Sequence, residues 1–269
     1  MKPTVSFIVL FYRDAPTIEA VIRPLSEILK KHCSDYEIIA IDDHSPDDTW
    51  AAIQRAAHKF PKIVPMRNET NLGVGASFRR AVEATQFEWI GYTDGDDQYE
   101  TSDLARYFPL FGDHDVVTGD RSPRAEGWYR KCVSLHFNFL IQCAFRLSLR
   151  DTNSALKLYR GSMLRKLSTW DDAALYDTEI LVRLKYDFGA RIVEIPINHR
   201  QRAQGAGAGV SASNILSILQ GITTPRLQLY AADRWGRNIL NNYCATLAFG
   251  VRLLARIKAA RTRTDSKAA

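Results

Sequence analysis

Cysteine is scarce in this sequence, and its few copies form no pattern. The four cysteines include no Cys-x-x-Cys pair and share no metal-type spacing with the six histidines. A zinc site or a disulfide framework is therefore not expected, and the prediction is reduced thiols in the cytoplasm. The histidines are just as scattered, and none of them is assigned to a metal.

Long apolar segments are missing as well. The charge-free run Tyr243–Val251 falls well short of the ~20 residues that a membrane-spanning helix needs. It is expected either to pack on the core or to lie on a membrane surface. The apolar run Val5–Phe11 near the start lacks the cleavage region of a signal peptide, so no export signal is predicted.

The composition is that of an ordinary globular protein. Hydrophobic residues make up 46% of the 269 residues and charged residues 25%, and no repeat of solenoid length occurs. This length suffices for one large α/β domain with a helical appendage. We place the boundary near residue 210, with the main domain over 1–210 and a helical, basic extension over 211–269.

Basic residues are concentrated in the C-terminal quarter. The formal net charge is +6, yet residues 199–269 contain eleven Lys/Arg and two Asp/Glu, a local charge of +9. Such a segment binds anionic lipid, nucleic acid or phosphorylated compounds, or is simply a solvated tail. No nucleic-acid-binding motif accompanies it, so no nucleic-acid partner is expected.

The first half alternates strand signals with amphipathic helices. An apolar stripe at helical spacing runs through Ile18–Leu29, and Ser45 is predicted to cap a helix that carries Ile53–Phe60. Alternation with short connections predicts a mostly parallel sheet covered by helices on both faces. The strands are expected at Val5–Phe11, Tyr36–Ile41, Ile63–Arg67, Trp89–Thr93 and Asp115–Gly119.

The pattern beyond Arg121 is less regular. Gln201–Gly209, with three glycines and three alanines, predicts a mobile loop. Further strands are expected at Ser154–Tyr159 and Arg191–Ile197, and helices at Trp128–Leu147, Asp177–Phe188, Ser213–Leu219 and Asn238–Ile257.

One acidic cluster stands directly after the fourth predicted strand. Asp94-Gly95-Asp96-Asp97-Gln98 gathers three carboxylates and an amide. Asp94, Asp96 and Gln98 project to one side if the chain stays extended, and such oxygen ligands suit Mg²⁺ or Mn²⁺ shared with a phosphate. Adjacent carboxylates repel one another, which makes the cluster costly without a cation. The alternative is an acidic turn exposed to water.

Two other strand ends could contact a nucleotide, because ligands bind at the carboxyl ends of strands in parallel sheets. Asp42 and Asp43 can accept hydrogen bonds from a base or ribose. Gly73 and Gly75 let the backbone approach a ligand closely. These glycines do not complete a dinucleotide fingerprint, because Phe78 takes the place of the third glycine and the motif follows the third strand.

Three arginines are candidates for binding phosphate. Arg121 follows the fifth predicted strand, and Arg200 and Arg202 precede the glycine-rich loop. Guanidinium forks match phosphate oxygens, and a basic pair ahead of a flexible loop fits a lid that closes on a charged ligand. Each of the three could instead be an ordinary surface residue.

Taken together and in order, these segments resemble glycosyltransferase family 2, and more narrowly its dolichyl- or polyprenyl-phosphate mannose synthase branch. The resemblance spans roughly the first 205 residues. Its motifs are Val5–Tyr12 with Pro16 and Glu19, the Asp-Asp-x-Ser-x-Asp-x-Thr run at 42–49, the Asn-x-Gly-x-Gly-Ala signature at 71–76, Tyr92–Tyr99, Gly119–Arg121, Asp151-Thr152 with Lys157, Asp177–Glu179 and Glu194–Arg202. The chain departs from the pattern at Val74, where relatives often have a basic residue, and at Asn153–Leu156.

The resemblance implies a GT-A (Rossmann-like) domain over 1–210 and inversion at the anomeric carbon. Asp94, Asp96 and Gln98 would hold Mg²⁺ or Mn²⁺ and, with Arg121, form the catalytic centre. Asp43 would contact the nucleotide of a nucleoside-diphosphate sugar. Arg121 and Arg200 or Arg202 would bind phosphate groups.

The acceptor is the open question. A lipid phosphate is already ionised and can attack unaided, whereas a hydroxyl needs a base. Tyr176-Asp177-Thr178-Glu179 replaces the Glu-Asp pair usual for hydroxyl acceptors, which favours hexose transfer to polyprenyl phosphate at the cytoplasmic membrane face by a peripheral protein. Asp177 could still serve as a base or merely favour a helix N-terminus. Transfer to a glycan hydroxyl and a non-catalytic, membrane-recruited binding module are the alternatives.

Overall fold

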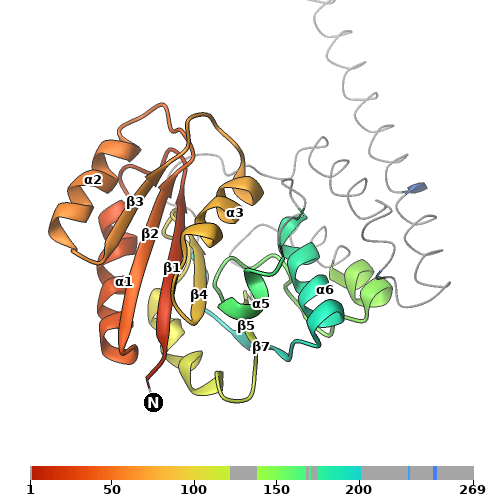
Figure 1. Ribbon diagram of the computed structural model, residues 1–269. Coiled ribbons are helices and arrows are strands. Elements are labelled where there is room, and N and C mark those ends of the chain that lie inside the picture. Colours follow the sequence, from red (N-terminus) through yellow and green to blue (C-terminus); the bar gives the residue numbers. More distant parts are fainter. Residues whose placement is uncertain are drawn as a thin grey trace, which may run out of the picture.

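The computed structural model describes residues 2–121, 138–167, 170, 175–200, 230 and 245–246. Its centre is a seven-stranded sheet in the order β3-β2-β1-β4-β6-β5-β7 (Figure 1). Six of the strands run in one direction, and only β6 is antiparallel to its neighbours. The expected α/β class with a mostly parallel sheet is confirmed.

The four strands of the first half are all parallel to their neighbours. They are β1 (Thr4–Phe11), β2 (Asp35–Asp42), β3 (Ile63–Arg67) and β4 (Trp89–Asp94). Apart from their first residues, β1 and β2 are buried along their whole length, as their continuous apolar runs predict. β3 forms the edge and is more exposed.

Helices join these strands and cover the sheet. α1 (Ile18–His32) and α2 (Thr49–Lys59) lie together on one side of it, and α3 (Val74–Ala84) lies on the other (Figure 1). α1 turns its predicted stripe to the core, from Ile18 through Leu25 to Leu29. Two short 3₁₀ turns, η1 (Thr101–Arg106) and η2 (Phe108–Leu110), follow β4.

The second half completes the sheet with one reversed strand. β6 (Lys157–Arg160) runs antiparallel to both β4 and β5 (Val116–Asp120), and β7 (Ile192–Pro196) is parallel to β5. α5 (Gly161–Leu164) and α6 (Tyr176–Phe188) pack beside it, and residues 138–145 are helical. α6 ends at Gly189, whose φ of 64° is the left-handed conformation that suits glycine.

Two local predictions are wrong. Ser45 does not cap α2: its Oγ accepts the backbone N–H of Arg13 at 3.0 Å, and the helix begins only at Thr49. The strand predicted from Ser154 begins at Lys157, because the N–H of Ala155 donates to Tyr99 Oη at 2.9 Å and takes no part in the strand pairing. The Gln201–Gly209 loop, the first ten residues of the predicted helix Trp128–Leu147 and nearly all of the 211–269 extension lie outside the described residues.

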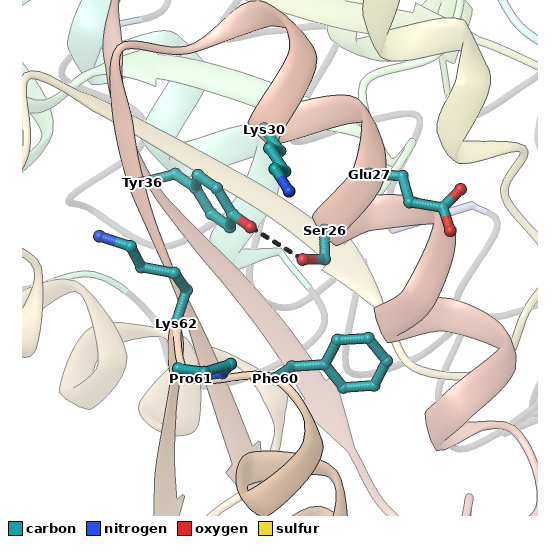
Figure 2. A pocket seen from close by; sticks show the side chains of 7 residues that line it. All are labelled: Ser26, Glu27, Lys30, Tyr36, Phe60, Pro61 and Lys62. Atoms are coloured by element: carbon teal, nitrogen blue, oxygen red, sulfur yellow. Dashed lines mark hydrogen bonds between the residues drawn. The ribbon is translucent and has the colours of Figure 1, made fainter.

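Within the described part of the chain, no helix is both long and apolar enough to cross a bilayer. A surface hollow lies at the amino ends of β2 and β3, on the opposite edge of the sheet from the predicted site (Figure 2). It is lined by Ser26, Glu27, Lys30, Tyr36, Phe60, Pro61 and Lys62. Its place in the sheet separates it from the acidic strand ends.

Candidate active site

The carboxyl ends of β1, β2 and β4 bring the predicted acidic residues to one edge. β1 lies between the other two strands, with Phe11 opposite Asp42 and Leu10 opposite Asp94. The chain then continues along the same edge, because the N–H of Asp43 donates to the carbonyl of Phe11 at 3.0 Å. Side chains that are about fifty residues apart in the sequence therefore flank a single strand.

Gly95 turns the chain sharply at the end of β4. Its N–H donates to the carbonyl of Leu10 at 2.8 Å, and its own carbonyl accepts Thr17 Oγ1 at 2.6 Å. A Cβ atom here would lie 2.1 Å from a ring carbon of Phe11 and 2.8 Å from the Leu10 carbonyl oxygen. Only glycine fits, so the strand end is held tightly between β1 and the start of α1.

The residues of the predicted cation site suit a hard cation. Asp94 and Asp96 are half-buried carboxylates, and the N–H of Gln98 donates to Asp96 Oδ1 at 3.2 Å. Gln98 Nε2 donates to the carbonyl of Arg200 at 3.0 Å, so its Oε1 is the atom that it can offer to a cation. Two carboxylates and an amide oxygen match the preference of Mg²⁺ and Mn²⁺, which share further positions with water and phosphate.

No cluster of three or more His, Cys, Asp or Glu side chains suited to a metal occurs among the described residues. The predicted set has only two carboxylates besides the amide, so it depends on a ligand to complete the coordination. This is the usual arrangement for Mg²⁺ at a phosphate-binding site.

Asp43 holds the glycine-containing loop. Its Oδ1 accepts the side-chain amide of Asn68 and the N–H of Leu72, both at 2.8 Å, and its Oδ2 accepts the N–H of Gly73 at 2.9 Å. Gly73 takes a φ of 81°, which favours glycine. Asp43, the predicted nucleotide contact, thus also shapes the loop 71–75. The last residue of this loop, Gly75, already belongs to α3, and its carbonyl accepts Trp170 Nε1 at 3.0 Å.

Asp42, by contrast, faces inward. It is fully buried, its Oδ1 accepts the N–H of Ser45 at 2.9 Å, and its Oδ2 lies 3.1 Å from Arg67 Nε. These contacts fix the turn after β2. Asp43 is buried as well, at 7% exposed, with its two oxygens bound by Asn68 and by the backbone of Leu72 and Gly73.

Two of the three predicted phosphate-binding arginines already have carboxylate partners. Arg121 forms a fork with Asp151, with Nε 2.6 Å and Nη2 2.9 Å from the two oxygens, and is 12% exposed. Arg200 contacts Glu100, and its backbone N–H donates to the carbonyl of Gln98 at 2.8 Å. Arg200 therefore lies beside the cation-site residues, while Arg202 is outside the described residues.

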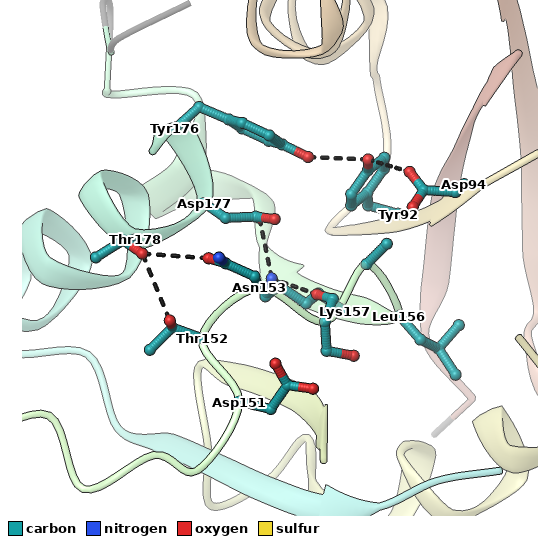
Figure 3. A network of polar contacts seen from close by, with 12 residues as sticks. Tyr92, Asp94, Asp151, Thr152, Asn153, Leu156, Lys157, Tyr176, Asp177 and Thr178 are labelled. Atoms are coloured by element: carbon teal, nitrogen blue, oxygen red, sulfur yellow. Dashed lines mark hydrogen bonds and ion pairs between the residues drawn. The ribbon is translucent and has the colours of Figure 1, made fainter. Parts of the chain in front are cut away.

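Asp177 is buried at the start of α6. One of its carboxylate oxygens lies 2.9 Å from Nζ of Lys157, which is completely buried and also donates to the carbonyl of Ser154 (Figure 3). Burial raises the pKa of Asp177, and the ammonium group of Lys157 opposes that rise. The sequence signal for this pair is Lys157, a charged residue within the otherwise apolar stretch 155–159.

A chain of hydroxyl groups joins α6 to the cation-site residues. Tyr176 Oη donates to Tyr92 Oη at 2.9 Å, and Tyr92 Oη donates to Asp94 Oδ1 at 2.6 Å (Figure 3). Burial raises the pKa of both tyrosines well above its usual value, and the charge of nearby carboxylates adds to the rise. The sequence did not reveal this contact, because Tyr92 and Tyr176 stand in motifs 84 residues apart and neither motif links the two side chains.

Comparison with known proteins settles the family. Residues 6–168 match the family model described as Glycosyl transferase family 2. The chain belongs to this family. Its placement agrees with the strand-end motifs and with the order in which they occur.

This chain has modest sequence similarity to curated proteins. It is 24% identical over 203 residues to an undecaprenyl-phosphate 4-deoxy-4-formamido-L-arabinose transferase of Aeromonas hydrophila, covering 75% of this chain and 61% of that protein. A protein of the same name from Sodalis glossinidius is 25% identical over 226 residues, with 82% and 67% covered. The chain thus spans about three fifths to two thirds of these relatives.

Solved glycosyltransferase structures share the fold. Glucosyl-3-phosphoglycerate synthase from Mycobacterium tuberculosis, in complex with Mn²⁺, UDP and phosphoglyceric acid, gives a TM-score of 0.66 at 16% identity, covering 86% of this chain and 80% of that one. The mannosyltransferase PcManGT from Pyrobaculum calidifontis, in complex with GDP-Man and Mn²⁺, gives 0.59 at 17% identity, covering 100% and 85%. At this identity the likeness establishes the GT-A fold.

Proposed function

We propose that this glycosyltransferase moves a sugar, a hexose by the resemblance of its motifs, from a nucleoside diphosphate to polyprenyl phosphate, with inversion. The observation that carries the acceptor class is the burial of Asp177 against Lys157. The names of the curated relatives, which are undecaprenyl-phosphate transferases, support the same class.

Asp177 is not a suitable base for a hydroxyl acceptor. A base that activates a hydroxyl must reach the acceptor and must take up its proton. Asp177 is 6% exposed and bound to a buried ammonium group, so it meets neither condition. A phosphate oxygen needs no deprotonation, and it can attack the anomeric carbon as the bond from that carbon to the diphosphate breaks.

The strand-end residues divide the remaining work. Asp94, Asp96 and Gln98 would hold Mg²⁺ or Mn²⁺, which neutralises the charge of the leaving diphosphate. Asp43 would contact the nucleotide and shape the loop at Gly73 through the hydrogen bonds described above.

The arginines complete the proposed site. Arg121 and Arg200 would bind phosphate oxygens of donor or acceptor, with Arg121 oriented by its fork to Asp151. A lipid acceptor would bring the protein to the cytoplasmic face of the membrane as a peripheral protein, where the basic C-terminal quarter would meet anionic lipid.

A transfer assay with two acceptors tests the proposal. Purified protein is incubated with Mn²⁺, labelled GDP-, UDP- and dTDP-sugars, including a formamido-arabinose donor, and either polyprenyl phosphate or the matching polyprenol. We expect a lipid-linked product from polyprenyl phosphate alone. No product from polyprenyl phosphate with any donor would refute the lipid-phosphate acceptor, and product from polyprenol instead would support transfer to a hydroxyl.

Asp96→Asn and Asp97→Asn form a matched pair for this assay. Asp96 belongs to the proposed cation site, whereas Asp97 points to Arg200 at 4.0 Å and has a φ of 58° that asparagine also tolerates. We expect a loss of at least about a hundredfold for Asp96→Asn and a change of a few-fold for Asp97→Asn. Equal activity of the two variants would refute the role of Asp96 in the cation site, whereas no transfer by the wild type to any acceptor would argue for a non-catalytic binding module.

A further inference from the structure

The strongest unexplained feature is the hydroxyl chain beneath the acidic edge. Tyr92 and Tyr176 are both buried, and the proposed reaction uses neither. Their hydroxyl groups lie in line with Asp94, the first carboxylate of the proposed cation site (Figure 3). The acceptor of the last hydrogen bond is Asp94 Oδ1, at 2.6 Å.

The order of donors in this chain is fixed by its geometry. The single proton of Tyr92 is given to Asp94, so the Tyr92 oxygen must accept the proton that Tyr176 donates. A hydroxyl that accepts one hydrogen bond becomes a stronger donor in the next. Tyr176 therefore strengthens the hydrogen bond that Tyr92 makes to the carboxylate.

Both rings are held in place by packing. Phe78 of α3 lies against them, with ring centroids 4.8 Å from Tyr92 and 5.9 Å from Tyr176. The two tyrosine rings themselves meet edge to face at 6.4 Å. Aromatic rings packed in this way have little freedom to turn, so the hydroxyl that meets Asp94 has a fixed position.

We propose that Tyr92, aided by Tyr176, is a positioning residue that orients the carboxylate of Asp94 for cation binding. The hydrogen bond to Oδ1 restrains the orientation of this carboxylate, which is half-buried at the strand end. Partners that orient metal ligands in this way contribute about 10- to 100-fold to metal affinity. The inference rests on the proposed cation site and adds to it the residues that shape it.

Measuring Mn²⁺ binding directly tests this proposal. The dissociation constant is obtained by electron paramagnetic resonance of free Mn²⁺, titrated to millimolar concentration with the full chain and no nucleotide. We expect Tyr92→Phe to weaken Mn²⁺ binding about tenfold, and Tyr176→Phe to weaken it about threefold. In the transfer assay, Tyr92→Phe should raise the Mn²⁺ concentration needed for half-maximal rate, while saturating Mn²⁺ restores most of kcat.

Tyr36→Phe is the matched control. Tyr36 is also a buried tyrosine with one side-chain hydrogen bond, to Ser26 Oγ at 2.9 Å, and it lines the hollow at the opposite edge (Figure 2). Tyr36→Phe should lower the free energy of unfolding in urea by an amount similar to that of Tyr92→Phe, and it should keep the Mn²⁺ affinity of the wild type.

The outcomes separate the two claims. If the wild type binds Mn²⁺ and folded Tyr92→Phe binds it within twofold of the wild type, the positioning role is refuted and the cation site stands. If Tyr92→Phe does not fold, an unchanged dissociation constant in Tyr176→Phe refutes it equally. If the wild type binds no Mn²⁺, the proposed cation site fails, and the positioning role fails with it.

Discussion

Lys157 shows how much a single buried charge can constrain the fold. Its side chain is completely buried in β6, and its nearest carboxylate belongs to Asp177 on α6, 2.9 Å away. Removing one partner of such a pair strands the other in a medium of low polarity, whereas removing both charges is often nearly neutral.

Charge removal at this pair gives the first prediction. Asp177→Asn should lower the free energy of unfolding by about 3 kcal/mol, and the double variant with Lys157→Met should recover most of that loss. Urea unfolding at pH 7 measures both. The double variant should also keep transfer to polyprenyl phosphate, and its complete loss would point to Asp177 as a base.

The loss of stability in Lys157→Met should be smaller in acid than at neutral pH. Without the lysine, burial and the charge of Asp94 raise the pKa of Asp177, so the folded state binds its proton more tightly than the unfolded state does. The contribution of this group to stability is then present below the unfolded pKa of about 4 and is lost as the pH rises through the folded pKa. A stability deficit that is smaller near pH 4 than at pH 7 is the expected result.

At the residue scale, sequence analysis found the candidates but not their partners. Asp94, Asp96 and Asp43 could be selected because acids after apolar strands are unusual and meet at one edge. The fork from Arg121 to Asp151 and the bond from Tyr92 to Asp94 depend on packing between distant segments. The spacing of Ser45 predicts a helix cap, yet its hydroxyl oxygen accepts the backbone N–H of Arg13 instead.

The turn after β4 is the element on which the site depends most. Gly95 packs between Phe11 of β1 and the start of α1. The sheet therefore fixes the positions of the acidic residues on both sides of Gly95. The loop 71–75 depends in the same way on Asp43 at the end of β2. Both elements are short irregular segments fixed by their neighbours.

Gly95→Ala should disturb this turn strongly. The added Cβ would meet Phe11 and the Leu10 carbonyl, which costs about 1–3 kcal/mol of stability, and Mn²⁺ affinity should fall because Asp94 and Asp96 shift. Gly112→Ala is the control, since nothing lies within 4 Å of its Cβ position. Thermal unfolding and Mn²⁺ titration should leave that control within about 0.5 kcal/mol of the wild type.

Asp43→Asn should loosen the loop 71–75. Where the carboxylate accepts the N–H groups of Leu72 and Gly73, an amide presents its own N–H₂ to one of them, at a cost of about 2 kcal/mol. We expect KM for the nucleotide sugar to rise more than kcat falls. Asp48→Asn, an exposed change in the same turn, should alter neither, and a matching effect there would contradict a specific role of Asp43.

At the scale of the whole molecule, Asp115 directly precedes β5 and links that strand to β6 and β7. It accepts hydrogen bonds from the backbone N–H of Arg191 at 3.0 Å and from Arg160 Nε at 3.1 Å, next to β7 and in β6. Burial raises the pKa of Asp115, but the bonds and charges of Arg191 and Arg160 outweigh it and lower the pKa overall. One ionised carboxylate therefore adds to the backbone pairing that holds the mixed half of the sheet.

Acid unfolding should report this carboxylate. Because the folded pKa of Asp115 lies below its unfolded value, its contribution is present above pH ~4 and is lost as the pH falls through the folded pKa. Asp115→Asn should lose about 2 kcal/mol at pH 7 and less at pH 3 in urea unfolding. Asp113→Asn, an exposed neighbour, should follow the wild type at both pH values.

At this scale the sequence predicted the layers better than the pairing. Alternating apolar strands and amphipathic helices were enough for the class and for β1 to β4. The reversal of β6 between β4 and β5 has no local signal, because a short apolar strand looks alike in either direction.

Because β6 lies between β4 and β5, the two halves of the sheet are also completed at different times during synthesis. During synthesis the contiguous segment 4–94 supplies β1 to β4 with their crossover helices, so the half that carries Asp43 and Asp94 has all its own strands before the rest of the chain exists. β4 must then wait for Lys157–Arg160 to cover its other edge. A nascent chain stalled between these points would expose an open, apolar edge strand, and this is where we expect the protein to need a chaperone most.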